Sequence, residues 1–269
     1  MPAGFHIDLA GGVARVVMDR PERHNAFDDA LISGLTKAFV DLAHDRSVDC
    51  VVLGATGASF SAGADLGWMK RAAEQDRAAN LADAQDLARL MRTLDELSKP
   101  TVAVVQGAAY GGGVGLIACC DIAIAAETAK FAFSEVRLGL IPAVIGPYVV
   151  RAIGPRQARR YFQTGEIFGA AEAERIGLLH ESVGADDLES RASAILTALH
   201  AVAPEARKAA KRLVADVLHR PIDDEVSDMT AGRIADIRAR DEAKEGLSAF
   251  FERRKPGWQQ QKRSGNEPR

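Results

Sequence analysis

The stretch that decides the fold is Val105–Pro142, which reads VQGAAYGGGVGLIACCDIAIAAETAKFAFSEVRLGLIP. The apolar, β-branched run Thr101–Val105 leads into it and predicts a buried strand that ends at Gly107. The glycine triplet 111–113 then opens an apolar run to Cys119, which predicts a helix. The first N–H groups of such a helix have no intrahelical partner and can hold a phosphate or an oxyanion. The triplet alone does not separate this function from a simple packing turn.

Composition places the chain among ordinary globular proteins. Its 269 residues are 47% hydrophobic and 26% charged, enough for one large domain or one domain with a small appendage. A net charge of −3 gives no general affinity for nucleic acid. Cys50, Cys119 and Cys120 lack metal-ligand spacing and indicate reduced core thiols. Neither a secretion signal nor a membrane span is evident, so the expected location is the cytoplasm.

The N-terminal quarter predicts a hairpin and a helix. Phe5–Leu9 and Val13–Met18 flank Gly11-Gly12, which is typical of a β-hairpin. Asp28 or Asp29 is expected to cap a helix that runs to about Ala43, and its predicted inner face consists of Leu31, Leu35, Ala38, Phe39 and Leu42. A short strand, CVVLG at 50–54, precedes a loop of small residues at 55–69 that runs into a helix. The charged segment 71–97 is predicted to be one exposed helical region that ends at Lys99-Pro100.

The remainder of the chain divides near residue 200. Gly154-Pro155 is expected to break two helices, at 144–153 and 156–163, and a helix, a strand and a helix follow at 170–176, 178–183 and 186–201. Beyond Pro204 the pattern is entirely helical, over 205–218, 223–239 and 242–253. We therefore expect an α/β core over 1–200 and a helical region over 201–269. The sequence contains no GxGxxG, Walker, HExxH, CxxC or GxSxG motif, which leaves metal, nucleotide-phosphate and serine-nucleophile sites unsupported.

Several motifs together resemble the crotonase (enoyl-CoA hydratase/isomerase) superfamily. They are Phe60–Leu66 (FSAGADL), Gly107 with the triplet 111–113, Cys120-Asp121, and Glu135 followed by LGLIP at 138–142. The resemblance extends from Arg20-Pro21 to Phe250–Pro256. It implies an α/β fold, a ClpP/crotonase-like spiral of ββα turns, with C-terminal helices that build homotrimers or homohexamers. It also implies an acyl-CoA substrate, in which coenzyme A is part of the substrate, and no prosthetic group, metal, membrane or nucleic-acid partner.

The resemblance implies a chemistry of thioester enolates. The carbonyl oxygen gathers negative charge when a nucleophile adds at Cβ or a proton leaves a neighbouring carbon. By similarity, the backbone N–H groups of Ala64 and Gly112 are the donors to that oxygen, each worth about 3 kcal/mol. Glu135 corresponds to the second catalytic glutamate of the family hydratases. Its apolar surroundings, FAFSEVRLGLIP, predict a desolvated carboxylate with a raised pKa.

Gly115 departs from the hydratase pattern. Typical enoyl-CoA hydratases carry a first glutamate in GGGxE, whereas this sequence reads GGGVG. One glutamate at the second position also resembles the enoyl-CoA isomerases, in which a single base moves a proton between carbons. The stretch 111–154 resembles, in addition, a bacterial branch associated with methylglutaconyl-CoA and carboxygeranoyl-CoA hydratases, which shares the glycine. The segment after Pro142, AVIGPY, replaces the common GGxQR and fits a bulkier or branched acyl group.

The remaining site predictions are carried by the resemblance as well. The residues expected to contact coenzyme A are Arg23, Ala62, Ala64, Asp65, Leu66 and Lys255, with Lys255 reaching from a neighbouring subunit. Those expected around the acyl group are Trp68, Met69, Tyr110, Gly115 and Pro142. For Arg23 and Lys255 the alternative is a solvated surface cation, and for Trp68 and Met69 it is core packing.

Three functions remain open at this point. The leading prediction is hydration of a 2-enoyl-CoA. A Δ3–Δ2 enoyl-CoA isomerase needs only one base and the same oxyanion donors. A non-catalytic acyl-CoA-binding scaffold is consistent with the loss of one carboxylate at Gly115.

Overall fold

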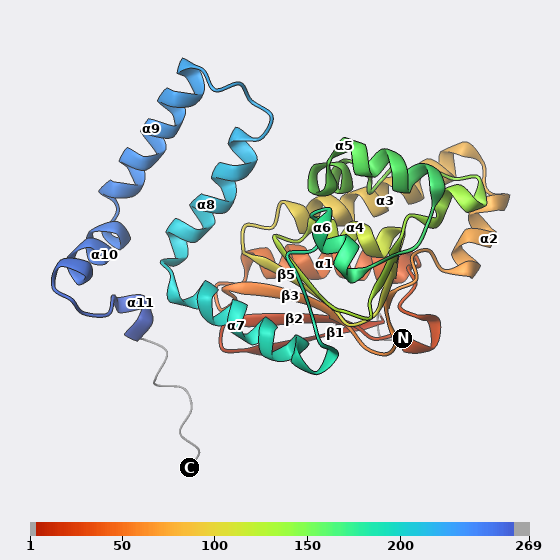
Figure 1. The fold of residues 1–269 in the computed structure, drawn as a ribbon, viewed down its shortest axis with the longest axis horizontal. Coiled ribbons are helices and arrows are strands. Elements are labelled where there is room, and N and C mark those ends of the chain that lie inside the picture. Colours follow the sequence, from red (N-terminus) through yellow and green to blue (C-terminus); the bar gives the residue numbers. More distant parts are fainter. Residues whose placement is uncertain (1–3, 261–269) are drawn as a thin grey trace, which may run out of the picture. The chain divides into compact units, whose positions relative to one another are not determined.

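The computed structural model describes residues 4–260, which form two compact units that divide between Ser193 and Ala194. The first unit contains two β-sheets with helices around them, and the described part of the second is helical (Figure 1). This agrees with the predicted α/β fold of crotonase type. The division falls within α7, Leu188–Ala201, a little before the boundary expected near residue 200.

The larger sheet has six strands in the order β1-β2-β3-β5-β7-β10. Their bounds are Phe5–Ala10, Val13–Met18, Cys50–Ala55, Thr101–Val105, Ile122–Ala126 and Glu181–Val183. β1 and β2 form the predicted antiparallel hairpin, in which Ala10 pairs with Val13 across Gly11-Gly12. The other pairs are parallel. β5 is buried along its whole length, as its β-branched run predicts for a central strand.

The smaller sheet has four strands in the order β4-β6-β8-β9, and the sequence patterns did not predict it. Its strands are Ser59–Ser61, Ala108–Tyr110, Lys130–Ala132 and Phe168–Gly169. β4, β6 and β8 run parallel to one another, and β9 is antiparallel to β8. With two or three residues each, these strands are too short to show the alternation by which strands are detected.

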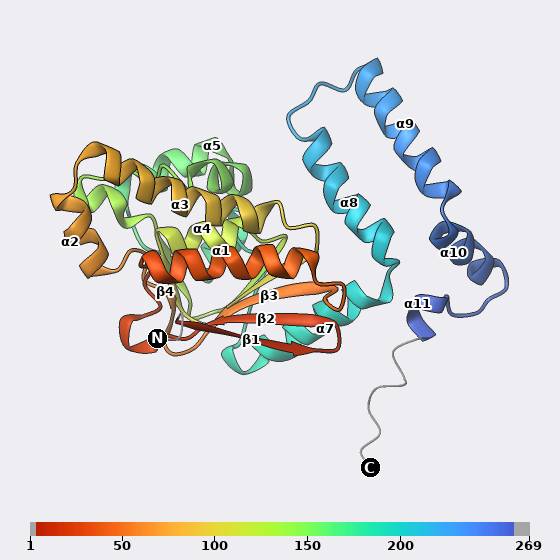
Figure 2. The same ribbon diagram turned by 180° about the vertical axis from the view of Figure 1, so that it is seen from behind.

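Helices cover the sheets of the first unit. α1, Asp29–His44, begins at Asp28, whose side chain accepts from Leu31 N, so the cap is the first of the two predicted aspartates. Its predicted inner face is buried, and it packs against α3 (Figure 2). The other helices and 3₁₀ turns are η1 Pro21–Arg23, α2 Leu66–Glu74, α3 Arg77–Asp95, α4 Gly112–Cys119, η2 Ser134–Leu138, α5 Gly146–Thr164, α6 Ala170–Arg175 and η3 Ala185–Asp187.

The prediction of one exposed helix over 71–97 was wrong in two respects. α2 ends at Glu74, and α3 starts afresh behind Asp76, whose carboxylate accepts from Ala79 N. The last turns of α3 are also buried, at Leu90, Met91 and Leu94. The high charge of the first turns of α3 concealed an amphipathic C-terminal half that packs on the core.

The break predicted at Gly154-Pro155 is present inside α5. Gly154 has φ 74° and ψ 160°, which interrupts the helix and leaves Pro155 at the start of a new helical turn. The second half of α5 places Tyr161 in an aromatic cluster with Phe131, Phe133 and Phe168. This cluster ties α5 to the smaller sheet.

The second unit consists of helices joined by polar contacts. After α7 come α8 Pro204–Val217, α9 Asp224–Ala239, α10 Asp241–Phe251 and α11 Gly257–Gln260. Arg254 pairs with Glu245 of α10, and Glu245 also accepts from Gly257 N at the start of α11. Phe250 and Phe251 are each 75% exposed, so α10 presents an apolar surface. None of the helices in residues 4–260 is long and apolar enough to cross a membrane.

Candidate active site

Three neighbouring parallel strands bring the predicted catalytic groups to one edge of the smaller sheet. Ala64 follows the end of β4, Gly112 follows the end of β6, and Glu135 follows the end of β8. Because these strands are parallel and adjacent in the order β4-β6-β8, their carboxyl ends meet at the same edge. Segments about 70 residues apart in sequence therefore converge on one place in the first unit.

The two turns that follow β4 and β6 pack directly on each other. A Cβ atom on Gly63 would lie 3.0 Å from the carbonyl oxygen of Tyr110, and Gly63 has φ 87°. A Cβ on Gly113 would lie 2.8 Å from Cβ of Ser61. Glycine is therefore required on both sides of the contact, for conformation at Gly63 and for space at Gly113. This contact fixes the spacing of the two predicted N–H donors.

The Ala64 N–H points away from Phe27, with which Ala64 forms a parallel bridge. Phe27 N donates to Gly63 O at 2.7 Å, and Asp65 N donates to Phe27 O at 2.8 Å. In this parallel bridge the amide of the intervening Ala64 points to the opposite side. Gly112 is the first residue of α4, so its N–H has no intrahelical acceptor. No acceptor within residues 4–260 is seen for either amide, which leaves both available to an oxyanion.

Glu135 lies next to the second of these turns. A Cβ on Gly111 would lie 3.0 Å from Glu135 Oε1, and Gly111 N donates to Ala132 O at 3.0 Å. Oε2 is buried and has no hydrogen-bond partner among the described residues. Burial raises the pKa of Glu135, against a smaller opposing effect of its own backbone N–H. The direction of this shift is the one predicted from the apolar segment.

The residues predicted to contact coenzyme A fall into two groups. Arg23 Nη1 lies 3.4 Å from Asp65 Oδ2, and Ala62 N donates to His24 O at 2.9 Å. These residues, with the exposed Leu66, form one continuous rim beside Ala64. Lys255 lies in the second unit, exposed between α10 and α11.

Asp65 already has a structural task. Its Oδ1 accepts from Gly67 N at 2.8 Å and Trp68 N at 3.2 Å, which caps α2. Partial burial alone would raise its pKa. These two hydrogen bonds and the charge of Arg23 outweigh burial, so the pKa lies below its usual range. The cap holds the turn that carries Ala64.

The residues predicted around the acyl group occupy the same three segments. Trp68 and Met69 are half-buried in the first turns of α2, and the buried Trp68 Nε1 has no acceptor among residues 4–260. Tyr110 is the half-buried last residue of β6, whose carbonyl meets Gly63. Pro142 is buried just beyond η2, and Gly115 is buried in α4.

Sequence reasoning missed two residues that shape the site. The Phe27 ring occupies the space beside Gly112, where a Cβ would lie 2.7 Å from its Cε2 atom. Asn25 is fully buried, accepts from Arg20 N at 2.8 Å, and donates to the carbonyls of Thr56 and Ser59. The available signal was an asparagine two residues before Phe27, but its carbonyl partners are 31 and 34 residues away and only the fold reveals them.

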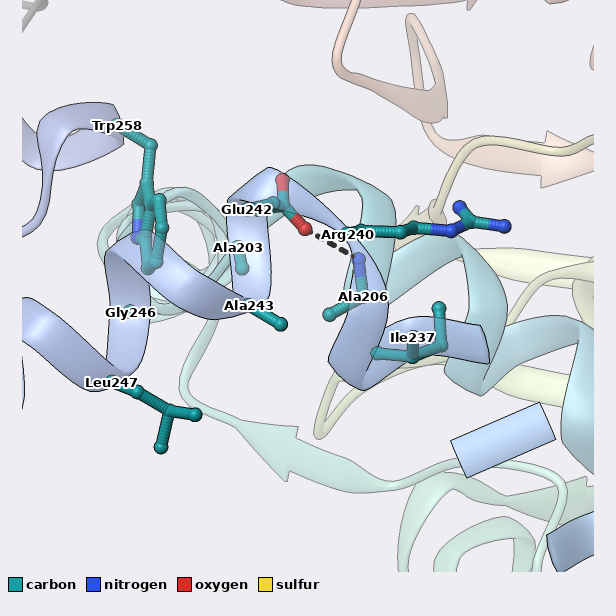
Figure 3. Close-up of a pocket in the computed structure, with 9 residues that line it drawn as sticks. All are labelled: Ala203, Ala206, Ile237, Arg240, Glu242, Ala243, Gly246, Leu247 and Trp258. Atoms are coloured by element: carbon teal, nitrogen blue, oxygen red, sulfur yellow. Dashed lines mark hydrogen bonds between the residues drawn. The ribbon is translucent and has the colours of Figure 1, made fainter. Parts of the chain in front are cut away.

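A cavity of about 290 Å³ lies within the second unit, and its lining differs from that of the candidate active site (Figure 3). Its walls are largely apolar, with Trp258 and Leu247 at one end and Ile237 at the other. Glu242 accepts from Glu205 N and Ala206 N, so its carboxylate caps α8 and is not poised for proton transfer. The cavity therefore offers an apolar recess without a free acid or base.

Comparison with known proteins agrees with this geometry. The sequence matches the family described as enoyl-CoA hydratase/isomerase over residues 8–261. A putative enoyl-CoA hydratase of Thermus thermophilus is 33% identical over 246 residues, covering 91% of this chain and 97% of the relative.

Solved structures of the same kind superpose on almost the whole chain. A crystal structure of an enoyl-CoA hydratase from Shewanella pealeana has a TM-score of 0.92 and 47% identity, covering 95% of this chain and 96% of the other. A putative enoyl-CoA hydratase/isomerase (crotonase) from Legionella pneumophila has a TM-score of 0.92 and 43% identity, covering 96% and 100%. With its sequence match, its fold and its converging turns, this chain belongs to the enoyl-CoA hydratase/isomerase (crotonase) family of enzymes.

Proposed function

We propose that this enzyme hydrates a 2-enoyl-CoA thioester reversibly, with Glu135 as its acid and base. The observation that supports this most is the buried, unpartnered Glu135 Oε2 beside Gly111, at the edge where the N–H groups of Ala64 and Gly112 also lie. A carboxylate without a partner in a half-buried setting costs stability, and a proton supplied by water or substrate would satisfy it.

The proposed reaction uses main-chain and side-chain groups for different tasks. Glu135 takes a proton from water as the water oxygen bonds to Cβ, and the π electrons of the double bond move to form the enolate. The Ala64 and Gly112 amides stabilise the negative thioester oxygen, each by about 3 kcal/mol. The protonated Glu135 then gives its proton to Cα, which regenerates the carboxylate. One water is added, and no other group changes its charge.

The proposed substrate is an enoyl-CoA with a bulky or branched acyl group, of the methylglutaconyl-CoA type. The supporting features are the apolar Ala143–Ile145 segment in place of the common GGxQR and the sequence likeness of the stretch 111–154 to hydratases of that kind. Arg23 is proposed to hold a coenzyme A phosphate, because 55% of its side chain is exposed despite the ion pair with Asp65.

The second unit is proposed to join subunits into a homotrimer or a homohexamer. The supporting observation is the exposed apolar surface of α10 at Leu247, Phe250 and Phe251. Lys255, which follows this helix, is proposed to reach the coenzyme A site of a neighbouring subunit. The cysteines of the described residues form no disulfide, and Cys50 and Cys119 are buried, which supports the proposal of a cytoplasmic location.

An isomerase that moves a 3,4-double bond to the 2,3-position is the second candidate. Gly115 favours it, because a single carboxylate is sufficient to move a proton from Cα to Cγ. The experiment that separates the two supplies 2-enoyl-CoA and 3-enoyl-CoA esters in deuterated water. Loss of enoyl absorbance with formation of a 3-hydroxyacyl-CoA supports hydration. Deuterium at Cα and Cγ without added water would instead establish the isomerase.

Replacing Glu135 tests its role in either reaction. The variant Glu135→Gln should lower kcat by about 10²–10⁴-fold and leave KM nearly unchanged, because the amide keeps the shape and loses the proton transfer. The neighbouring exposed Arg137→Gln is the matched control and should retain most of its turnover. A Glu135→Gln enzyme with full kcat would remove this residue from the mechanism.

A further inference from the structure

Gly115 lies one helical turn beyond the candidate oxyanion turn, on the same side of α4. Gly115 N donates to Gly111 O at 3.2 Å, so the two residues are stacked along the helix. Cα–Cβ bonds of a helix lean toward its N-terminus. A side chain at position 115 would therefore lean toward Gly111, beside which Glu135 Oε1 lies.

That space is already filled by hydrocarbon. A Cβ atom on Gly115 would lie 2.2 Å from Cγ2 and 2.9 Å from Cβ of Ile145, and 3.2 Å from Cε of Met91. Ile145 is 2% exposed and Met91 is fully buried, so neither side chain has room to move aside. Even alanine at position 115 would overlap atoms close to the backbone of Ile145, and a carboxylate would not fit.

Ile145 is held firmly in this position. It precedes α5, and its carbonyl accepts from Val149 N at 3.1 Å. Met91 is fixed at the buried end of α3, where Cys119 Sγ lies 3.9 Å from its sulfur. Three segments thus meet at the missing side chain, one each from α3, α4 and the turn before α5.

We propose that Ile145 determines substrate specificity, because its side chain occupies the space that a side chain at position 115 would need. This wall of the acyl site is therefore apolar, and Glu135 is the carboxylate that remains in the site. Gly115 lies one helical turn from Gly111, beside which Glu135 lies, so by this proposal the wall selects the group attached to Cβ of the enoyl chain. The proposal rests on the proposed function, which supplies the enoyl-CoA substrate. The packing of Gly115 against Ile145 can be tested without any substrate.

The packing test is a double-mutant cycle on thermal stability. Gly115→Ala should lower Tm by about 5 °C, because a methyl group is forced into filled space. Ile145→Ala removes the 2.2 Å contact with Cγ2 and leaves the 2.9 Å contact with Cβ, so Gly115→Ala should cost clearly less in that background. Ile153→Ala is the matched control: it is a buried isoleucine of α5 two helical turns further on, and with it Gly115→Ala should keep its full cost. An unchanged Tm in Gly115→Ala, or equal costs in both backgrounds, would overturn the proposal.

The specificity test compares a four-carbon 2-enoyl-CoA with its 3-methyl derivative. Ile145→Ala should raise the ratio of kcat/KM for the methylated ester to that for the plain ester by about tenfold, because a methyl-sized space opens at Cβ. Ile153→Ala should leave the ratio unchanged. If the unmodified enzyme turns over neither these esters nor longer ones, the proposed function fails and the stability cycle still decides the packing. If it turns over either ester and Ile145→Ala leaves the ratio unchanged, Ile145 has no role in specificity.

Discussion

At the scale of the residue, the site separates two kinds of group. The N–H donors belong to the backbone of Ala64 and Gly112, and the surrounding glycines keep side chains out of the way. The proposed proton carrier is a side chain, Glu135, whose burial raises its pKa. The roles follow from this division, since an amide donor has no titration near neutral pH and a desolvated carboxylate does.

Glu135 should make activity depend on pH. Because its pKa is raised, the carboxylate becomes protonated at a higher pH than an ordinary glutamate does. Hydration needs the ionised form to accept the proton of water, so kcat/KM should fall as pH decreases through this raised pKa. A pH profile from 5 to 9 measures it. A profile that stays flat until the ordinary range of a glutamate would contradict the effect of burial.

The same carboxylate should reduce the stability of the fold at neutral pH. A carboxyl group whose pKa is higher in the folded state binds its proton more tightly there, so its contribution to folding is favourable at low pH and is lost as pH rises through the raised pKa. Glu135→Gln should therefore raise Tm at pH 8 relative to the unmodified enzyme. The difference should vanish below the ordinary pKa of glutamate. A lower Tm at pH 8 would show that the charge is stabilised in the fold.

Asn25 holds the loop beneath the site and should be sensitive to replacement. Its amide donates to Thr56 O and Ser59 O and accepts from Arg20 N, and it is fully buried. Asn25→Ala leaves Arg20 N and Thr56 O without their partner, each worth about 1 kcal/mol or more, and leaves Ser59 O with Gln106 as its side-chain donor, so Tm should fall by several degrees. Asn80→Ala is the matched control on a half-buried helix face and should cost less. Equal losses would show that burial at Asn25 adds nothing.

At the scale of the element, the accuracy of the sequence predictions depended on the length of each element. The hairpin, α1 with its buried face and the break at Gly154 were predicted, since each carries a local pattern of turn residues, caps or periodicity. The strands of the smaller sheet carry none, because two or three residues cannot alternate. Their pairing is what brings Ala64, Gly112 and Glu135 together. The family resemblance therefore named the residues of the site and implied that they converge, and the fold shows the three short strands that bring them together.

Asp76 marks the boundary that the sequence prediction missed. It caps α3 through Ala79 N, and the Asn80 side chain donates back to Ala72 O and Gln75 O across the gap from α2. Asp76→Ala should destabilise the protein by about 1 kcal/mol. Asp86→Ala, on the exposed face of α3 beside Arg89, should cost less than half of that. Denaturant melts of the two variants compare them directly, and equal midpoints would exclude a capping role for Asp76.

At the scale of the whole molecule, the two units divide the work. The first unit carries both predicted donors and Glu135, and the second exposes Phe250 and Phe251 on α10. The helical character of this second unit was predicted from sequence, because three helical patterns follow Pro204 without a strand-like run, and the short α11 was not predicted. The exposed surfaces of these helices could not be predicted from sequence, because the side of a helix that stays exposed depends on tertiary packing.

The proposed assembly can be tested on this exposed pair. Replacing Phe250 and Phe251 together with serine should shift sedimentation from a trimer or hexamer toward the monomer, because association would lose its apolar contact. Leu9→Ser, an exposed apolar residue on β1, is the control and should leave the mass unchanged. A doubly substituted protein that sediments like the unmodified one would rule out this surface as the contact.

The parallel arrangement of β4, β6 and β8 has a consequence for how such a catalyst can diversify. The loop after each strand carries one of the proposed catalytic groups, and the two groups proposed to stabilise negative charge are main-chain amides. Replacing side chains in the third loop and the segment after it, up to Ile145, leaves those main-chain atoms where they are. New reactions of thioesters are therefore accessible through changes in about a dozen contiguous codons, while the main-chain amides proposed to bind the oxyanion are unchanged.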